Sequence, residues 1–198
     1  MNDRDRLFLA LSRPSAPSSD FDLNPDVVLP EGRTLRPAGV LVPVMRHPDG
    51  ARVLLTKRSS RLKHHPGQIA FPGGKQDDTD ADVTAAALRE AREEVGLPEE
   101  AVHVVGAMPK HETVTGFMMT PIVGWIDEPF DIRPEPGEVD EVFTVPLSHV
   151  IKAQEYSVQY RRWRGIRRHY YTVPFGPYYI WGATARILRG LAERMEAV

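Results

Sequence analysis

The chain has 198 residues, with 27 acidic side chains, 25 basic ones, a formal net charge of −2 and no cysteine. This length fits one domain with or without arms, and it is enough to bury a sizeable core. The balanced charge gives no general attraction to nucleic acid or acidic lipid, and the lack of cysteine excludes disulfides and thiolate metal sites.

The N-terminal segment 1–37 is expected to form a short helix over residues 3–12 and then an irregular arm, because proline and serine are frequent after the helix. Its apolar run 7–11 is too short for a signal peptide or a membrane span, and no later run approaches the length of a membrane helix. We therefore expect a cytoplasmic protein without a membrane partner, whose main domain covers residues 38–198.

Two apolar runs, 39–45 and 53–58, follow the arm and flank a segment rich in turn formers, so they predict a β-hairpin. The next segment, 59–82, contains too many turn formers for regular structure beyond a short strand at 68–71.

Residues 83–95 predict a strong helix, because alanine, leucine, glutamate and arginine are all good helix formers. Asp80 or Asp82 can cap its start, and Gly96 is well placed as the left-handed residue at its end. The predicted buried face consists of Ala87, Ala91 and Val95, with Leu88 beside them.

The rest of the chain predicts further strands, a hairpin and a final helix. The strands cover 101–109, 116–126 and 141–147, and the hairpin turns around Gly165. The final helix covers 179–197, and its predicted core stripe consists of Ile180, Ala183, Thr184, Ile187, Leu188 and Leu191. Mixed strands with a central and a C-terminal helix predict an α/β sandwich.

The stretch REAREEVG at 89–96 places Glu90 and Glu94 one above the other on a single helix face, with Glu93 alongside. Like charges at this spacing repel by roughly 0.2–0.5 kcal/mol. Such a run can be a solvated face, in which Arg89 and Glu93 form an ordinary pair. The alternative is that the carboxylates hold a hard divalent cation, which neutralises a diphosphate and makes a water nucleophilic.

The stretch 73–97 resembles the signature of the Nudix hydrolases: glycine, five residues, glutamate, seven residues, then R-E-U-x-E-E-x-G-U, where U is a bulky aliphatic. The second half is matched by Arg89, Glu90, Glu93, Glu94, Gly96 and Leu97, with Ala91 at a U position. The first half departs from the signature. The sixth residue after Gly74 is Asp80 instead of glutamate, and eight residues instead of seven separate it from Arg89.

The stretch 54–74, LLTKRSSRLKHHPGQIAFPGG, resembles a second motif, which the coenzyme A pyrophosphatase branch of this family carries. The matching residues are Leu54, Leu55, Thr56, Arg58, Ser59, Gly67, Phe71, Pro72, Gly73 and Gly74, and Lys63 stands where the motif has arginine. Members of that branch commonly carry the same one-residue insertion and an aspartate before the catalytic helix. The resemblance covers roughly residues 38–191.

The resemblance implies a Nudix-type α/β/α sandwich with a mixed central sheet. It also implies hydrolysis of the diphosphate of coenzyme A, or of an acylated or oxidised derivative, to adenosine 3′,5′-bisphosphate and 4′-phosphopantetheine or its derivative. Glu90 and Glu94 would hold Mg²⁺ or Mn²⁺ with Glu93 assisting. Gly73 and Gly74 let backbone approach the ion or phosphate, and the Gly74 carbonyl is a candidate for a further ligand.

Cations and further acids complete the expected site. Arg58 and Lys63 are candidates for phosphate contact, Arg58 as a bidentate donor and Lys63 as a point charge. Glu138 and Glu141 are candidates for the extra acid that many Nudix enzymes place on a loop as base or metal ligand, and a surface role stays open for each. Arg89 is expected to fix the acidic cluster.

Three other interpretations stay open: a Nudix diphosphatase for another substrate such as ADP-ribose or NADH, an isomerase on the same fold, and a non-catalytic binding module. The isomerase is expected to use a catalytic cysteine, which this chain lacks. The basic run 161–169 is interpreted as a hairpin turn and not as a nucleic-acid site. The aromatic residues in and after that hairpin are interpreted as core or interface: Trp163, Tyr170, Tyr171, Tyr178 and Tyr179. A homodimer is left open.

Overall fold

The computed structural model describes residues 1–163 and 165–198; Arg164 and the side chain of Trp163 lie outside the described residues, and so does the prediction for the Trp163 ring. The helices are α1 (Asp3–Ser12), α2 (Val83–Val95), α3 (Leu147–Val150) and α4 (Gly182–Glu196), with 3₁₀ turns at Glu99–Ala101 and Ala153–Glu155. The strands are β1 (Ser18–Ser19), β2 (Arg36–Met45), β3 (Arg52–Arg58), β4 (Ile69–Ala70), β5 (Gly73–Lys75), β6 (His103–Ala107), β7 (His111–Glu112), β8 (Phe117–Ile126), β9 (Val139–Pro146), β10 (Ser157–Trp163) and β11 (Ile166–Thr172).

Among the described residues, nine strands form one mixed sheet in the order β1-β7-β8-β2-β3-β4, with β5 paired to β2, β6 to β8 and β9 to β3. The central pair is β2 and β8, which run parallel from Arg36↔Phe117 to Met45↔Ile126. Strands β3 and β9 pair antiparallel beside them. The remaining strands, β10 and β11, form a separate antiparallel hairpin.

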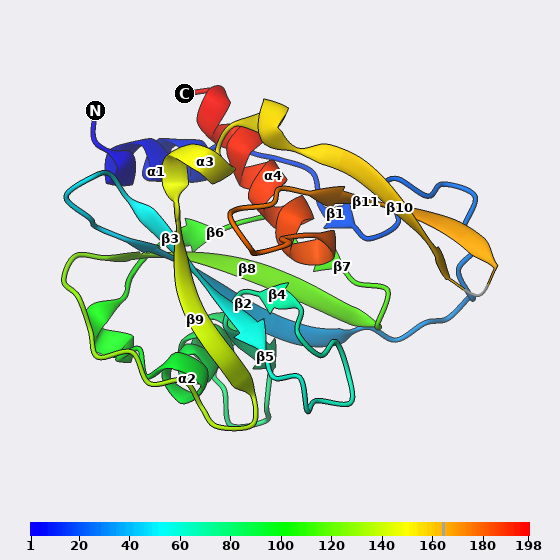
Figure 1. Cartoon of the computed structure of the whole chain (residues 1–198), viewed down its shortest axis with the longest axis horizontal. Coiled ribbons are helices and arrows are strands. Elements are labelled where there is room, and N and C mark those ends of the chain that lie inside the picture. Colours follow the sequence, from blue (N-terminus) through cyan, green and yellow to red (C-terminus); the bar gives the residue numbers. More distant parts are fainter. Residues whose placement is uncertain (164) are drawn as a thin grey trace.

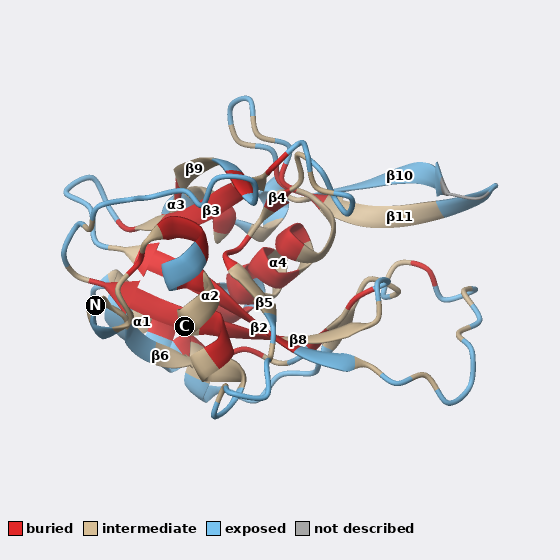
Figure 2. Cartoon of the chain, turned by 90° about the horizontal axis from the view of Figure 1, so that it is seen from below, coloured by how far each residue is buried: buried red, intermediate tan, exposed pale blue. Residues whose placement is uncertain are grey.

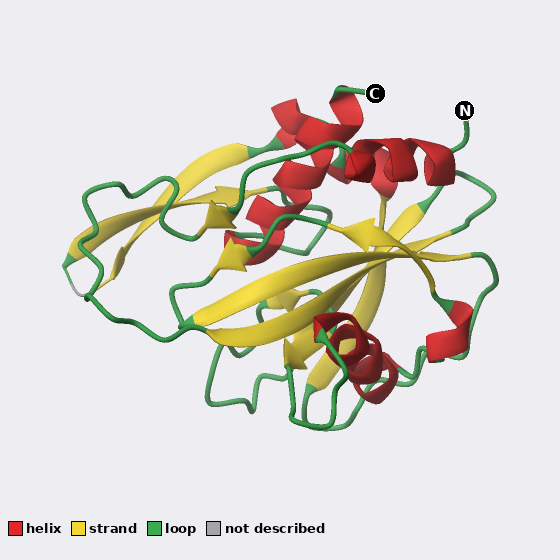
Figure 3. Cartoon of the chain, turned by 180° about the vertical axis from the view of Figure 1, so that it is seen from behind, coloured by secondary structure: helices red, strands yellow, loops and turns green. Residues whose placement is uncertain are grey.

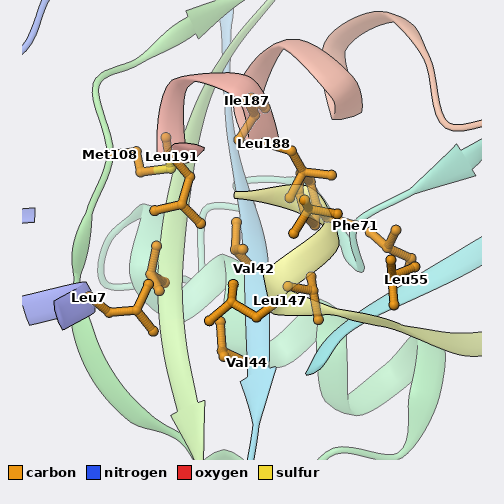
Figure 4. Packing of buried hydrophobic residues seen from close by; sticks show 14 of the residues in the cluster. Leu7, Val42, Val44, Leu55, Phe71, Met108, Leu147, Ile187, Leu188 and Leu191 are labelled. Atoms are coloured by element: carbon orange, nitrogen blue, oxygen red, sulfur yellow. The ribbon is translucent and has the colours of Figure 1, made fainter. Parts of the chain in front are cut away.

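Helix α2 covers one face of the sheet, whereas α1, α3 and α4 lie on the other (Figure 1, Figure 3). Side chains alternate along the strands, so Leu41 and Leu54 pack against α2. Their neighbours Val42 and Leu55 join Leu188 of α4 in the larger core cluster (Figure 4). A mixed sheet between helices is the α/β/α sandwich expected from the sequence, and that prediction is confirmed.

Helix α2 begins and ends where the sequence predicts. Asp82 Oδ1 accepts the backbone N–H groups of Thr84 and Ala85, each at 2.8 Å, so Asp82 is the cap and not Asp80. Gly96 follows in the left-handed conformation with φ of 74°. The predicted buried face is confirmed for Ala87, Ala91 and Val95.

Strand β2 is more than the hairpin partner that the sequence predicts. Its register with β3 covers only Val44↔Val53 and Met45↔Arg52, whereas on its other edge β2 pairs along its whole length with β8. Near its start it also pairs with β5, a Gly-Gly-Lys strand without any apolar pattern. Helix α2 approaches this point so closely that a Cβ on Gly39 would lie 2.1 Å from the Val83 carbonyl oxygen. Gly39 therefore lets α2 rest directly on the β2–β5 pair.

The late hairpin around Gly165 is confirmed as β10 and β11, and it projects from the sandwich (Figure 2). Helix α4 begins at Gly182, and its buried positions are Thr184, Ala185, Ile187, Leu188, Leu191, Ala192, Arg194 and Met195. The prediction of Ala183 in this stripe is wrong. Ala183 is half-buried, because the buried face runs through Thr184 and Leu188 and passes beside it.

The N-terminal segment contributes to the same core. Leu7 and Ala10 of α1 are buried in the cluster on the α4 side, and β1 pairs with β7. Asn24 bonds to both backbone groups of His169 in β11, at 2.8 and 2.9 Å. The boundary at residue 37 stays a prediction. Within the described residues, no helix has the length and apolar character that a membrane crossing requires.

Candidate active site

Strand β5 runs under α2, which brings the backbone of Gly73 and Gly74 to the acidic face of the helix. The Gly73 N–H donates to Glu94 Oε2 at 3.3 Å. A Cβ on Gly74 would lie 2.5 Å from Glu90 Oε1, so any side chain there would displace that carboxylate. The double glycine therefore lets two carboxylates of one helix face lie next to the β5 backbone.

Arg89 ties the helix to the turn before it. Its Nε and Nη2 bind the two carboxylate oxygens of Asp80 at 2.9 and 3.0 Å, a bidentate pair. Its Nη1 donates to Glu90 at 3.1 Å and to Glu93 at 3.0 Å. The hydrogen bond with Arg89 lowers the pKa of Asp80, and the same bond raises the pKa of Arg89. Arg89 thus stays charged and orients two of the acidic side chains.

Glu94 is a buried carboxyl group, only 5% exposed. Its pKa is raised to about 8, chiefly by burial, with Glu90 and Glu138 adding to the shift and Arg58 opposing it. Burial also raises the pKa of Glu90. Glu93 differs from both, since its side chain is 51% exposed and lies at the rim of the site. A cation between Glu90 and Glu94 would favour the ionised form of each and reverse both shifts.

The structure separates the two acids near the start of β9: Glu138 directly precedes the strand, and Glu141 lies within it. Glu138 adds to the raised pKa of both Glu90 and Glu94, so its charge lies within electrostatic reach of the pair. Glu141 instead accepts a hydrogen bond from the Tyr178 hydroxyl, in the segment that leads into α4. The acidic face of α2 therefore gains Glu138 and not Glu141.

The two expected phosphate contacts also differ. Arg58, the last residue of β3, lies close enough to Glu94 to oppose the rise of its pKa. Lys63 is exposed in the loop between β3 and β4. In the same loop His65 takes a φ of 55°, and its pKa is lowered by burial and then by the charge of Arg58. Of the two expected phosphate contacts, Arg58 is therefore the one that the fold brings close to Glu94.

The donor groups suit Mg²⁺ or Mn²⁺, because carboxylates and a backbone carbonyl are hard oxygen ligands. Among the described residues the Gly73 N–H alone donates to the Glu94 side chain, so the other acceptor positions of this carboxylate are available to a ligand. No set of three histidine, aspartate or glutamate side chains in residues 1–163 and 165–198 already forms a complete metal cage. Mg²⁺ needs only one or two carboxylates beside water and phosphate, and Glu90 with Glu94 meets that need.

Two residues of this framework were not assigned to it from the sequence. The sequence offers Asp80 as a helix cap, but its carboxylate is the bidentate partner of Arg89. The available signal was its place in the Nudix signature, where a glutamate is expected. Gly39 carries no chemical group, and only the distance between β2 and α2 reveals why it is needed.

The amino-acid sequence also resembles known proteins. A family model described as the NUDIX domain matches residues 35–164. The chain is 46% identical over 157 residues to "Uncharacterized Nudix hydrolase NudL" of Cronobacter sakazakii, which covers 79% of this chain and 81% of that protein. It is 41% identical over 190 residues to the protein of the same name from Klebsiella pneumoniae, which covers 90% of this chain and 98% of the relative.

Solved structures share the fold. The NUDIX domain of Shewanella oneidensis NrtR, solved with ADP ribose, superposes with a TM-score of 0.53 at 15% identity, covering 89% of this chain and 97% of that one. A MutT protein from Methanosarcina mazei Go1 gives a TM-score of 0.51 at 19% identity, covering 85% and 97%. These identities show the fold alone. The family model and the two NudL relatives show more: the chain belongs to the Nudix hydrolase family.

Proposed function

We propose that this Nudix hydrolase cleaves the diphosphate of coenzyme A or of its acylated or oxidised derivatives. The observation that carries the proposal is the position of the stretch 54–74. That stretch resembles the coenzyme A pyrophosphatase motif, and its residues border the acidic face of α2. Gly73 bonds to Glu94, and Arg58 lies within electrostatic reach of Glu94. The substrate motif and the hydrolytic motif thus meet at one carboxylate.

In this proposal Glu90 and Glu94 hold Mg²⁺ or Mn²⁺, with Glu93 at the rim and the Gly74 carbonyl as a further ligand. When bound, the cation supplies charge neutralisation and a water of lowered pKa. Arg89 keeps Glu90 and Glu93 in place through its bonds to both, and Asp80 keeps Arg89 in place. The acidic ligands are therefore oriented before the substrate arrives.

The remaining side chains handle the proton and the phosphate charge. Glu138 lies within electrostatic reach of Glu90 and Glu94, so it is the better placed acid to take the proton from the attacking water. Arg58 binds a diphosphate oxygen. Water adds to one phosphorus, and the bond from that phosphorus to the bridging oxygen breaks. The products are adenosine 3′,5′-bisphosphate and 4′-phosphopantetheine, or its derivative.

A panel of diphosphate substrates tests this assignment. Purified protein with Mg²⁺ or Mn²⁺ is incubated separately with coenzyme A, acetyl-coenzyme A, coenzyme A disulfide, ADP-ribose and NADH, and products are identified by mass. We expect the coenzyme A compounds to be cleaved with the highest kcat/KM and to give the two products above. If coenzyme A stays intact while ADP-ribose or NADH is cleaved well, the substrate assignment is wrong and the Nudix chemistry stands.

A further inference from the structure

Arg161 of β10 and Trp181, the residue before α4, form a stacked pair. The guanidinium carbon of Arg161 lies 4.4 Å from the centre of the Trp181 ring. Tyr170, on the neighbouring strand β11, meets the same indole edge-on at 5.0 Å, and its hydroxyl lies 3.2 Å from that of Tyr179. An arginine placed over an indole has a fixed plane, so its N–H groups point in defined directions.

This pair lies next to the proposed active site. Trp181 directly precedes Gly182, where an added Cβ would lie 3.7 Å from Gln68 Nε2. The Gln68 carbonyl in turn accepts the Arg58 backbone N–H at 2.9 Å. The first turn of α4 is attached to β4, the short strand that follows Gln68 (Figure 1). There, Thr184 Oγ1 donates to the Ile69 carbonyl at 3.0 Å. A short series of neighbouring residues, Trp181, Gly182 and Gln68, therefore lies between Arg161 and Arg58.

The histidine His65 senses the charge of both arginines, Arg58 and Arg161. Arg58 and Arg161 both lower the pKa of His65, so both guanidinium groups lie within electrostatic reach of one imidazole. Arg58 lies within electrostatic reach of Glu94 at the diphosphate end, while Arg161 is an exposed residue of β10. A substrate with phosphate groups at two separated places would match two separated arginines.

We propose that Arg161, held in orientation by Trp181, binds the phosphomonoester on the nucleoside end of the substrate. This inference rests on the proposed function, because coenzyme A carries a 3′-phosphate beyond its diphosphate. A planar guanidinium makes bidentate contact with such a phosphate. Arg161 is then a specificity residue that acts on binding, and Trp181 is a positioning residue that acts through it.

The experiment compares coenzyme A with 3′-dephospho-coenzyme A, which differ only in that phosphate. We expect Arg161→Gln to raise the KM for coenzyme A by about tenfold or more, since about 1.4 kcal/mol of phosphate binding is a tenfold change. Its kcat, and both constants for the dephospho compound, should stay within about twofold. Arg162→Gln is the matched control, because Arg162 points to the opposite face of β10 and pairs with Arg167.

Trp181→Phe tests the positioning role without removing the ring. It should raise the KM for coenzyme A by a few-fold, and leave kcat and the dephospho compound unchanged. The inference is overturned if Arg161→Gln weakens both substrates equally, leaves both unchanged, or matches Arg162→Gln. Wild-type protein that cleaves neither compound overturns the proposed function and this inference with it. Wild-type protein that cleaves both equally well overturns the inference alone.

Discussion

Helices α2 and α4 each bury one ionisable side chain, and the two side chains differ in how many hydrogen bonds the chain gives them. Arg194 of α4 is 7% exposed and donates to the carbonyls of Ala10, Leu11 and Arg13 at 3.0, 2.9 and 2.6 Å. Those carbonyls belong to the end of α1, where a cation is favoured. Glu94 of α2 is 5% exposed, but within the described residues it accepts only the Gly73 N–H.

The difference matches the metal-binding role that we propose for Glu94 and gives Arg194 a structural one. Arg194 joins two helices, although its Nη1 finds no partner among the described residues. Glu94 is placed beside other acids, Glu90 and Glu138, which make its ionisation more costly. Arg58 offsets this cost only in part, so the metal-free carboxyl group keeps its proton up to a higher pH, and a bound cation would favour its ionised form. The predictions below test this contrast, in order of decreasing expected effect.

Glu94→Gln should lower kcat by about 10³-fold or more, roughly 4 kcal/mol of barrier, because it removes the buried ligand while keeping its shape. Activity is measured on coenzyme A, and folding by circular dichroism and the melting temperature. Glu193→Gln on α4 is the control, since Glu193 forms a surface pair with Arg189 and should change neither. A Glu94→Gln protein that no longer folds would make Glu94 a structural residue like Arg194.

Glu138→Gln should lower kcat by about 10²-fold, close to 3 kcal/mol, if Glu138 is the general base. Glu141→Gln is its matched partner and should stay within about twofold, because Glu141 is engaged by Tyr178 on the α4 side. Pre-steady-state hydrolysis measured at saturating coenzyme A separates this effect from binding. If kcat falls equally in the two variants, the assignment of Glu138 as the general base is wrong.

Arg194→Met should destabilise the fold by about 2–3 kcal/mol, because three carbonyls at the end of α1 lose a charged donor. Urea unfolding measures the change, and kcat below the transition should remain within about twofold of wild type. Arg92→Ala is the surface control, since Arg92 is 57% exposed and pairs with Glu99. A large loss of kcat in the folded Arg194→Met protein would break the contrast between the helices.

The stability of the metal-free protein should fall as the pH rises from about 4.5 to about 8. Burial raises the pKa of Glu94 above its ordinary value, so the folded chain holds that proton more tightly than the unfolded chain. The slope is at most about 1.4 kcal/mol per pH unit. Glu94→Gln should remove this part of the slope in urea titrations with a chelator, and parallel curves would contradict the assignment. Adding Mg²⁺ should restore stability mainly at the upper end of the range.

Local signals in the sequence were sufficient for helix α2 and for the fold class. The helix formers, Asp82 and Gly96 all act within a few residues of one another, so the ends of α2 could be predicted. The short strand β5 could not, because Gly-Gly-Lys has no apolar alternation and pairs only through β2. The prediction that Ala183 is buried was wrong, because residue spacing alone does not show which face of the helix packs on the sheet.

The candidate site was predictable where its residues share one helix or one motif. Glu90, Glu94 and Gly74 come together through spacing that the sequence displays. The choice between Glu138 and Glu141 depends on where β9 enters the sheet, which residue spacing does not encode. The contact between Arg161 and Trp181 joins the hairpin to the start of α4. It could not be predicted, because no local sequence pattern in either segment indicates the other.

The way the N-terminal segment is held has a practical consequence for how the protein can be cut. Residues 1–24 are anchored by the buried Leu7, by the Asn24 bonds to β11 and by the Asp22–Arg186 pair at 2.7 Å. The stretch that follows is largely exposed, with Val28 at 93%. If a protease cleaves this stretch, the two fragments should stay associated and elute as one peak in size-exclusion chromatography. They should separate only under denaturing conditions. A chain begun at residue 35, where the family match starts, would instead lose a piece of its core.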